Sequence, residues 1–270
     1  MKSTDSFPIY VINLERSQDR RARITHQLEK LGLQYTLFSA VDGKSLSEEE
    51  LSRDYDPITT LAVMGRQLSL GEIGCSLSHI GVYRDLIESK APYALILEDD
   101  AELAETLPKA LAALAQVLSP QDNRVYLLNQ VHRYTLWNHK KLPSVGKLCP
   151  IIESYCANGY VVTRKSAEIL LQNLYPVNQV ADNWNTLLKL RTLKIVGLIP
   201  YVVGLYNDHA VQSNIEGREE LMSPLKKRGL KPYLKKMLYR KFAYQIFIKP
   251  LFRIKKQKSL NLNQRELTPK

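Results

Sequence analysis

The sequence predicts one α/β domain with a mostly parallel central sheet, followed by a basic C-terminal tail. Short apolar runs rich in β-branched residues alternate with helical patterns over residues 8–203, which is the order typical of α/β folds. Residues 93–97 (YALIL) are apolar without interruption, as expected for a central strand covered on both faces. After Pro224 the composition becomes basic. We therefore expect a globular domain over residues 1–224 and a tail over 225–270.

The first half of the domain carries clear signals for strand and helix ends. Ser17 is a suitable N-cap for a charged helix that Gly32 ends, and Ser47 with Glu50 forms a capping box. The expected strands are 8–14, 34–40 and 93–97, and the expected helices are 17–31, a short one after Ser47, 70–89 and 107–118. Small residues of the helix 70–89 share one face, which allows a neighbouring element or a ligand to approach closely. These are Gly71, Gly74, Ser78 and Gly81.

The second half of the domain continues the alternation with shorter elements. We expect strands at 125–129 and 159–163, and one or two more within 194–203. Helices are expected at 165–174 and from Asp182 to about residue 190. Residues 132–150 show neither period and are expected to be irregular.

The charge is concentrated in the tail. Residues 226–258 contain 13 Lys or Arg and no Asp or Glu, so the preceding domain is slightly acidic despite the net charge of +11. A basic tail favours an anionic surface such as a membrane or nucleic acid. The three cysteines include no C-x-x-C, so we expect no disulfide framework, no zinc site and a reducing compartment. We see no signal peptide and no apolar stretch of 18 residues.

The acidic triplet Glu98, Asp99 and Asp100 directly follows the central strand. Ligands of α/β sheets bind beyond the carboxyl ends of the strands. Because side chains alternate in extended chain, Glu98 and Asp100 should point one way and Asp99 the other. A divalent cation, Mn²⁺ or Mg²⁺, would offset the repulsion between the carboxylates and stabilise a diphosphate leaving group. An exposed acidic loop is the alternative.

Four segments of the chain resemble glycosyltransferase family 25, which includes bacterial lipooligosaccharide galactosyltransferases and glucosyltransferases. They are VINLERSQDRR at 11–21, LGEIGCSLSH at 70–79, ALILEDD at 94–100, and GYVVT at 159–163 with Asp182 downstream. The resemblance implies a GT-A-type, Rossmann-like fold, a UDP-hexose donor and transfer with inversion to a β-linkage. It favours galactose, then glucose, and an acceptor in lipooligosaccharide or lipopolysaccharide biosynthesis.

Candidate roles follow from this resemblance and from the chemistry of each residue type. The donor-binding candidates are Asn13, Arg16, Arg20, His79, Glu98 and Asp99, the metal ligands are Asp100 and His209, and the catalytic base is Asp182, with Asp208 in reserve. Arg can bind phosphate through a forked contact, and an inverting transfer needs a base on the acceptor hydroxyl. A tryptophan beside Asp182 would suit the apolar face of a sugar. Structural alternatives remain: a solvated helix face for the arginines, a buried histidine for His79, an N-cap for Asp182 and a surface histidine for His209.

The basic tail mixes Lys and Arg with apolar residues at helical spacing, as membrane-surface segments do. We expect it to hold the protein on the inner face of the cytoplasmic membrane, where a lipid-linked oligosaccharide acceptor would lie. Two other functions use the same features. A nucleic-acid-binding protein would use the basic tail, although no binding motif accompanies it and we expect no nucleic acid partner. A metal-dependent phosphohydrolase would use the triplet, but needs more clustered ligands.

Overall fold

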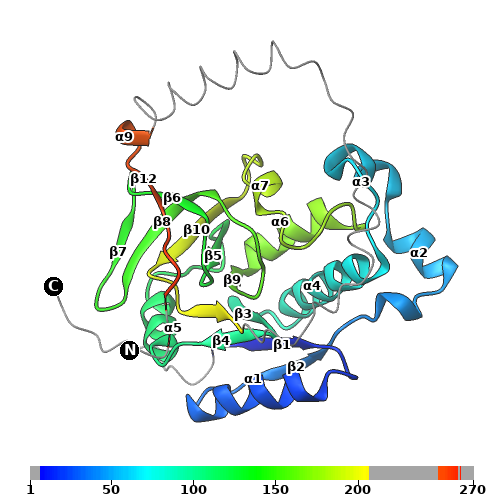
Figure 1. Ribbon diagram of the computed structural model, residues 1–270, viewed down its shortest axis with the longest axis horizontal. Helices are drawn as coiled ribbons and strands as arrows, with labels where there is room; N and C mark the ends of the chain where they lie inside the picture. The colour runs from blue at the N-terminus through cyan, green and yellow to red at the C-terminus, as the bar shows by residue number, and fades with distance from the viewer. Residues whose placement is uncertain (1–6, 207–248, 261, 263–270) are drawn as a thin grey trace.

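The computed structural model describes residues 7–206, 249–260 and 262, which fold around one large sheet (Figure 1). The helices are α1 (Gln18–Lys30), α2 (Glu48–Asp54), α3 (Pro57–Met64), α4 (Leu70–Glu88), α5 (Leu107–Ala115), α6 (Arg164–Leu174), α7 (Trp184–Leu187) and α9 (Lys249–Leu251), with a 3-10 turn η1 (Gly43–Ser45). The strands are β1 (Ile9–Asn13), β2 (Thr36–Ser39), β3 (Tyr93–Glu98), β4 (Ala101–Leu103), β5 (Arg124–Leu127), β6 (Arg133–Thr135), β7 (Lys140–Leu142), β8 (Gly146–Glu153), β9 (Gly159–Thr163), β10 (Lys194–Ile199), β11 (Val203–Leu205) and β12 (Ile254–Lys256).

The large sheet has the strand order β12-β6-β8-β10-β5-β9-β3-β1-β2, and β7 pairs with β8. Strands β2, β1 and β3 are parallel, as are β5 and β10, whereas β9 runs antiparallel between β3 and β5. Five strands of the central part therefore share one direction, and the outer strands β8, β6 and β12 add antiparallel pairs. The predicted α/β class and the mostly parallel centre are confirmed.

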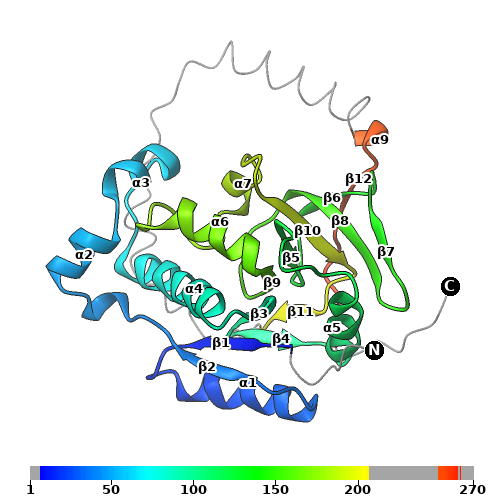
Figure 2. The same ribbon diagram turned by 180° about the vertical axis from the view of Figure 1, so that it is seen from behind.

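Strand β3 is buried on both faces. Ala94 and Ile96 belong to the core cluster that includes α4 and α6, and Leu95 and Leu97 belong to the cluster that includes α1 and α5. All four side chains are fully buried, which explains why the strand shows no polar alternation. Figures 1 and 2 show α1 on one side of β1 and α4 on the other.

The small-residue face of α4 serves packing between elements. A Cβ atom at Gly74 would lie 2.5 Å from the Gly43 nitrogen, and one at Gly81 would lie 2.5 Å from the Phe38 ring. The Ser78 hydroxyl accepts a hydrogen bond from the Val41 amide at 2.8 Å. These contacts bring η1 and β2 against the helix, so this face is closed to a ligand by the chain itself.

The expectation of irregular structure for residues 132–150 was wrong. Strands β6 and β7 and the start of β8 lie there, at the edge of the sheet. β6 and β7 have three residues each, and β7 exposes Lys140 and Lys141. Strands so short and so charged carry almost no period-two signal, which is how natural edge strands avoid unwanted pairing.

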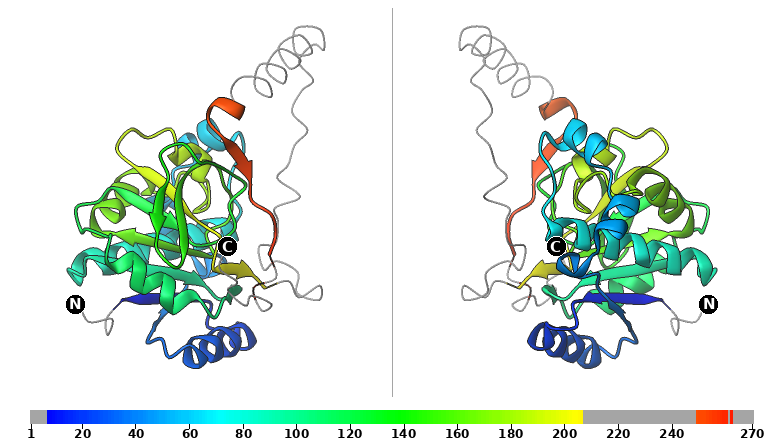
Figure 3. Two further views of the ribbon diagram at one scale, coloured as in Figure 1. Left: turned by 90° about the vertical axis from the view of Figure 1, so that its left-hand side faces the viewer. Right: turned by 90° about the vertical axis from the view of Figure 1, so that its right-hand side faces the viewer.

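The end of the predicted tail returns to the sheet. Strand β12 pairs antiparallel with β6, and the Leu260 amide donates to the Tyr201 hydroxyl at 2.7 Å (Figure 3). Leu262 is buried in the same cluster as α1 and α5. The boundary at residue 224 and most of the basic stretch lie outside the described residues. Within the described ranges, no helix has the length and apolarity needed to cross a membrane.

Candidate active site

The acidic triplet lies at the carboxyl end of β3, beside the carboxyl end of the parallel strand β1. Glu98 is the last residue of β3 and pairs in register with Ile12, while Asp99 and Asp100 form the turn into β4. The predicted position of the triplet at the end of a core strand is confirmed. Side chains from β1, α1, α4 and β9 converge on it.

Asp99 is held by the protein itself. Its carboxylate accepts hydrogen bonds from Asn13 Nδ2 at 2.7 Å and from Arg20 Nη1 at 3.3 Å, and the residue is 9% exposed. Burial raises the pKa of the Asp99 carboxyl, and the bonds from Asn13 and Arg20 oppose that shift. These two hydrogen bonds hold the turn in place. The Asp99 side chain faces α1 and the Glu98 side chain faces α4, as the alternation of side chains in an extended chain predicted.

Arg16 lies apart from this contact. It is largely exposed and pairs with Asp42, whose other carboxylate oxygen accepts the Lys44 amide at 3.1 Å. The ion pair joins the loop after β1 to the turn η1. The structure therefore brings Arg20 to the triplet and places Arg16 at the loop above α1, where its role in donor binding remains a prediction.

Glu98 ends a buried chain of hydrogen bonds. His79 Nε2 lies 3.0 Å from Glu98 Oε1, His79 Nδ1 lies 2.6 Å from the Tyr160 hydroxyl, and that hydroxyl lies 2.7 Å from the Tyr83 hydroxyl. The imidazole is 1% exposed and both tyrosines are fully buried. Burial raises the pKa of Tyr83 and of Tyr160, so both keep their protons.

The donor and the acceptor of each hydrogen bond in this network follow from the group at its end. A carboxylate only accepts, so His79 donates a hydrogen bond from Nε2 to Glu98. With Nε2 as the donor, Nδ1 is the acceptor for the Tyr160 hydroxyl, and the Tyr160 oxygen accepts from Tyr83. Every donor has an acceptor in this arrangement, which fixes the tautomer of His79 and the orientation of Glu98.

Asp100 is a buried carboxyl with an unpartnered oxygen. Its Oδ1 has no hydrogen-bond partner among the described residues. Burial, then the charges of Glu98 and Asp99, raise the pKa of Asp100 to about 7. A buried carboxylate without a partner is costly, and a bound cation would remove that cost. A hard carboxylate oxygen of this kind is the ligand type that Mn²⁺ and Mg²⁺ prefer, and the binding of either ion here stays a prediction.

Two thiols lie next to the triplet, and sequence analysis assigned neither to the site. The ligand atoms of Cys75, His79 and Glu98 lie within 4.8 Å of one another. The pKa of Cys75 and that of Cys156 are both raised, by burial and then by nearby carboxylates. Glu98, Asp100 and Asp182 are among these carboxylates for both thiols, and Glu72 is a further one for Cys75.

Asp182 holds the loop before β9. Its Oδ2 accepts the Cys156 amide at 3.2 Å, and Cys156 has a φ of 80°. The N-cap of α7 is Asn183, so the expected capping role of Asp182 was wrong, as was a helix to residue 190. The expected sugar-facing tryptophan was also wrong: Trp184 is fully buried, and its indole donates to the Cys156 carbonyl at 2.9 Å.

His209 and Asp208 lie outside the described residues, so the predicted histidine ligand and the reserve base stay predictions. Tyr160 was missed because it meets His79 only where α4 lies against β9, and Tyr83, one turn after His79 on α4, was missed because it contacts His79 through Tyr160. The signal available in the sequence was a tyrosine, Tyr160, within an otherwise apolar strand.

Comparisons with known proteins show the family of the chain. A family model described as "Glycosyltransferase family 25 (LPS biosynthesis protein)" matches residues 7–184. Procollagen galactosyltransferase 2 of Homo sapiens is 29% identical over 168 residues, which cover 60% of this chain and 27% of that protein. A glycosyltransferase 25 family member of Aedes aegypti is 31% identical over 184 residues, which cover 63% of this chain and 30% of that protein. The chain thus spans less than a third of the length of these two relatives.

Among solved structures, mannose-1-phosphate geranyltransferase from Thermus thermophilus is similar over 72% of this chain and 73% of that one. The sequence identity is 10% and the TM-score is 0.35.

Proposed function

Because the chain belongs to glycosyltransferase family 25, we propose that it transfers a hexose from a UDP-sugar to a saccharide acceptor, with inversion to a β-linkage. Galactose is the favoured sugar, since relatives of this chain are named galactosyltransferases. A lipooligosaccharide or lipopolysaccharide acceptor is in keeping with the description of the family. The observation that carries the proposal is the buried Oδ1 atom of Asp100, which has no hydrogen-bond partner among the described residues and lies beside Glu98 at the end of β3.

Each residue of the triplet has a separate role in donor binding. Asp100 would hold a divalent cation, whose charge stabilises the diphosphate as the glycosidic bond breaks. Glu98, oriented by His79, would accept hydrogen bonds from the ribose hydroxyls. Asp99, Asn13 and Arg20 keep the turn in place, and Arg20 adds a positive charge near the phosphates.

A screen of UDP-sugars for thermal stabilisation tests the function directly. A bound donor raises the unfolding temperature by mass action, so one UDP-hexose with Mn²⁺ should stabilise the protein more than UDP-sugars of other classes. EDTA should remove most of the gain. Equal, metal-independent stabilisation by every nucleotide, or none at all, would contradict the proposal. An assay that detects sugar transfer rather than hydrolysis separates this enzyme from a phosphohydrolase.

Tyr160→Phe should weaken donor binding. The change leaves His79 Nδ1 without its donor, so the tautomer that orients Glu98 is no longer fixed. A lost hydrogen bond of about 1 kcal/mol corresponds to a roughly fivefold rise in KM for the UDP-sugar, with a smaller change in kcat. Steady-state kinetics with varied donor measures this.

Tyr83→Phe is the matched control for Tyr160→Phe. It removes an equally buried hydroxyl but leaves Tyr160 free to donate to His79. We expect a KM for the donor close to that of the wild type. If both changes raise the KM for the donor equally, loss of stability explains the Tyr160→Phe result and the positioning of Glu98 does not.

We propose that the basic stretch holds the enzyme on the inner face of the cytoplasmic membrane, near a lipid-linked acceptor. Replacing the eight Lys and Arg of residues 226–241 by Gln should abolish cosedimentation with vesicles of anionic phospholipid at physiological salt, since each contributes about 1 kcal/mol. Vesicles of zwitterionic lipid serve as control. Undiminished binding of this variant to anionic vesicles would contradict the proposal. A truncation at residue 224 would be a poorer test, because it also removes β12.

A further inference from the structure

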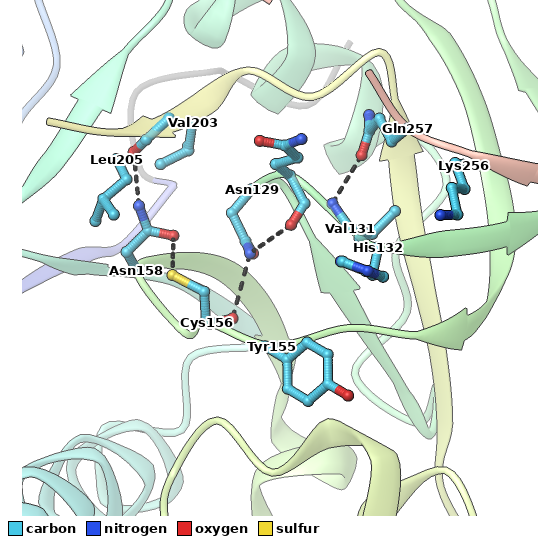
Figure 4. A pocket seen from close by; sticks show the side chains of 12 residues that line it. Asn129, Val131, His132, Tyr155, Cys156, Asn158, Val203, Leu205, Lys256 and Gln257 are labelled. Atoms are coloured by element: carbon cyan, nitrogen blue, oxygen red, sulfur yellow. Dashed lines mark hydrogen bonds between the residues drawn. The ribbon is translucent and has the colours of Figure 1, made fainter. Parts of the chain in front are cut away.

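A pocket of about 360 Å³ opens beside the triplet (Figure 4). Its walls come from the ends of β5 and β8, from the loop before β9, from β11 and from β12. Its volume lies within the range of about 300–1,000 Å³ typical of small-molecule sites. None of the residues predicted to form the active site lines it, and the described part of the tail supplies Lys256 and Gln257.

Two buried polar atoms of the pocket lack a partner among the described residues: Asn129 Oδ1 and Gln257 Nε2. Asn129 is 2% exposed and uses its nitrogen on the Cys156 carbonyl at 3.2 Å, which leaves the oxygen free. Gln257 uses its oxygen to accept the Val131 amide at 2.7 Å, which leaves the nitrogen free. In Figure 4 Asn129 lies in the middle of the pocket, with Asn158 to one side and Gln257 to the other.

The free atoms are one acceptor and one donor. A buried polar atom without a partner is costly, and a neighbouring ligand that offers both kinds of group would satisfy them. Sugar hydroxyls each donate and accept, so a pyranose matches this pair better than an anion or an apolar ligand does.

An aromatic side chain borders the pocket. The ring of Tyr155 is 54% exposed and is held from two sides: its hydroxyl donates to Glu153 at 3.0 Å, and His132 lies edge-on at a centroid distance of 5.9 Å. An exposed but fixed ring offers the apolar C–H face of a pyranose a packing surface. Tyr155 thus has the sugar-facing role that the sequence predicted for Trp184.

The pocket adjoins the candidate active site through the backbone. The Glu98 amide donates to the Asn158 carbonyl at 3.2 Å, and Asp182 accepts the Cys156 amide. On the other wall, Tyr206 directly follows Leu205 and donates its amide to the Asp100 carbonyl at 2.8 Å. A sugar in the pocket would therefore lie next to both the triplet and the proposed base.

We infer that this pocket is the acceptor subsite and binds the terminal pyranose of the saccharide acceptor. Asn129 Oδ1 and Gln257 Nε2 bind its hydroxyls, and Tyr155 packs against its ring. This inference rests on the proposed function, because it names the part of the molecule that receives the transferred hexose. The C-terminal strand β12, through Gln257, is then part of the binding site.

Binding of the methyl glycosides of glucose, galactose, mannose and N-acetylglucosamine tests the subsite. Saturation-transfer NMR on the full chain, with UDP and Mn²⁺ present, should detect at least one of them. Gln257→Glu keeps the oxygen that accepts Val131 but replaces the free donor by an acceptor, and Tyr155→Ala removes the ring. Each should weaken the glycoside at least about fivefold, the value of one hydrogen bond of about 1 kcal/mol, without a change in UDP affinity.

Two controls carry the same chemical changes away from the pocket. Trp137→Ala removes a ring that is 59% exposed, and Gln121→Glu adds the same charge at an exposed loop. Both should bind the glycoside as the wild type does. The subsite is overturned if no glycoside binds, if the pocket variants bind like the controls, or if they weaken the UDP-sugar instead, which would place the donor sugar there. Absence of UDP binding to the wild type would contradict the proposed function itself.

Discussion

Asp100→Asn should lower kcat/KM for sugar transfer roughly 10²–10³-fold, the loss typical of removing one group that stabilises developing charge. The amide is a weaker ligand for Mn²⁺ than a carboxylate. The Mn²⁺ concentration needed for activity should therefore rise, together with the loss of activity. Activity against varied Mn²⁺, with metal affinity from calorimetry, measures both effects.

The same substitution should leave the metal-free protein as stable as the wild type, or more stable. The buried Asp100 carboxyl has an oxygen without a partner among the described residues and lies beside two other carboxylates, so removing its charge relieves repulsion. Denaturant unfolding in EDTA gives this comparison. Asp19→Asn, at an exposed position in the first turn of α1, is the control; it should leave activity unchanged and lower stability by at most about 1 kcal/mol, the usual upper value of an exposed carboxylate at a helix N-terminus. A destabilised Asp100→Asn protein with normal Mn²⁺ affinity would show a structural role instead.

Asp182→Asn should reduce kcat by about 10²–10⁴-fold, as expected when a general base is removed. The Asn side chain keeps an oxygen that can accept the Cys156 amide, so the loop before β9 stays in place. Affinity for UDP should therefore be unchanged. Single-turnover transfer and calorimetric titration with UDP measure these two quantities.

Asp182→Ala completes the comparison, because it removes both the base and the acceptor for Cys156. If Asp182 only holds the loop, the Asn variant will turn over like the wild type and the Ala variant alone will be impaired. If it is the base, both variants will be inactive. Turnover of Asp182→Asn near that of the wild type therefore rejects the assignment.

The parts of the fold that the sequence predicted well are those whose signal is local. β3 is apolar on both faces, and Ser47 begins α2 with the predicted capping box. The prediction missed β6 and β7 because strands of three residues are too short to show a period, and β7 in addition exposes Lys140 and Lys141. β12 failed because its pairing partner lies far away in the chain and its basic residues match those of a surface segment.

In the candidate site, too, the features with a local sequence signal were predicted and those that depend on tertiary contacts were not. The triplet could be placed because a buried strand leads directly into it, whereas the role of Asp182 as base stays a prediction. The expected sugar-facing side chain Trp184 was wrong, because a large aromatic after a polar residue is equally suited to a core. Asn129 and Gln257 could not be predicted to meet, because only tertiary pairing of β12 with β6 brings them to one pocket.

The pairing of β12 with β6 has a consequence for the order in which the protein assembles. The contact between Val131 and Gln257 joins residues 126 positions apart. Contacts between positions so distant close a long loop, and their entropic cost makes them late events in folding. Until β12 has been synthesised and pairs with β6, one edge of β6 is unpaired and the pocket lacks one wall. On the proposed function, the nascent chain would complete its donor site before it could hold an acceptor, and a chain released early would bind a nucleotide yet have nothing to glycosylate.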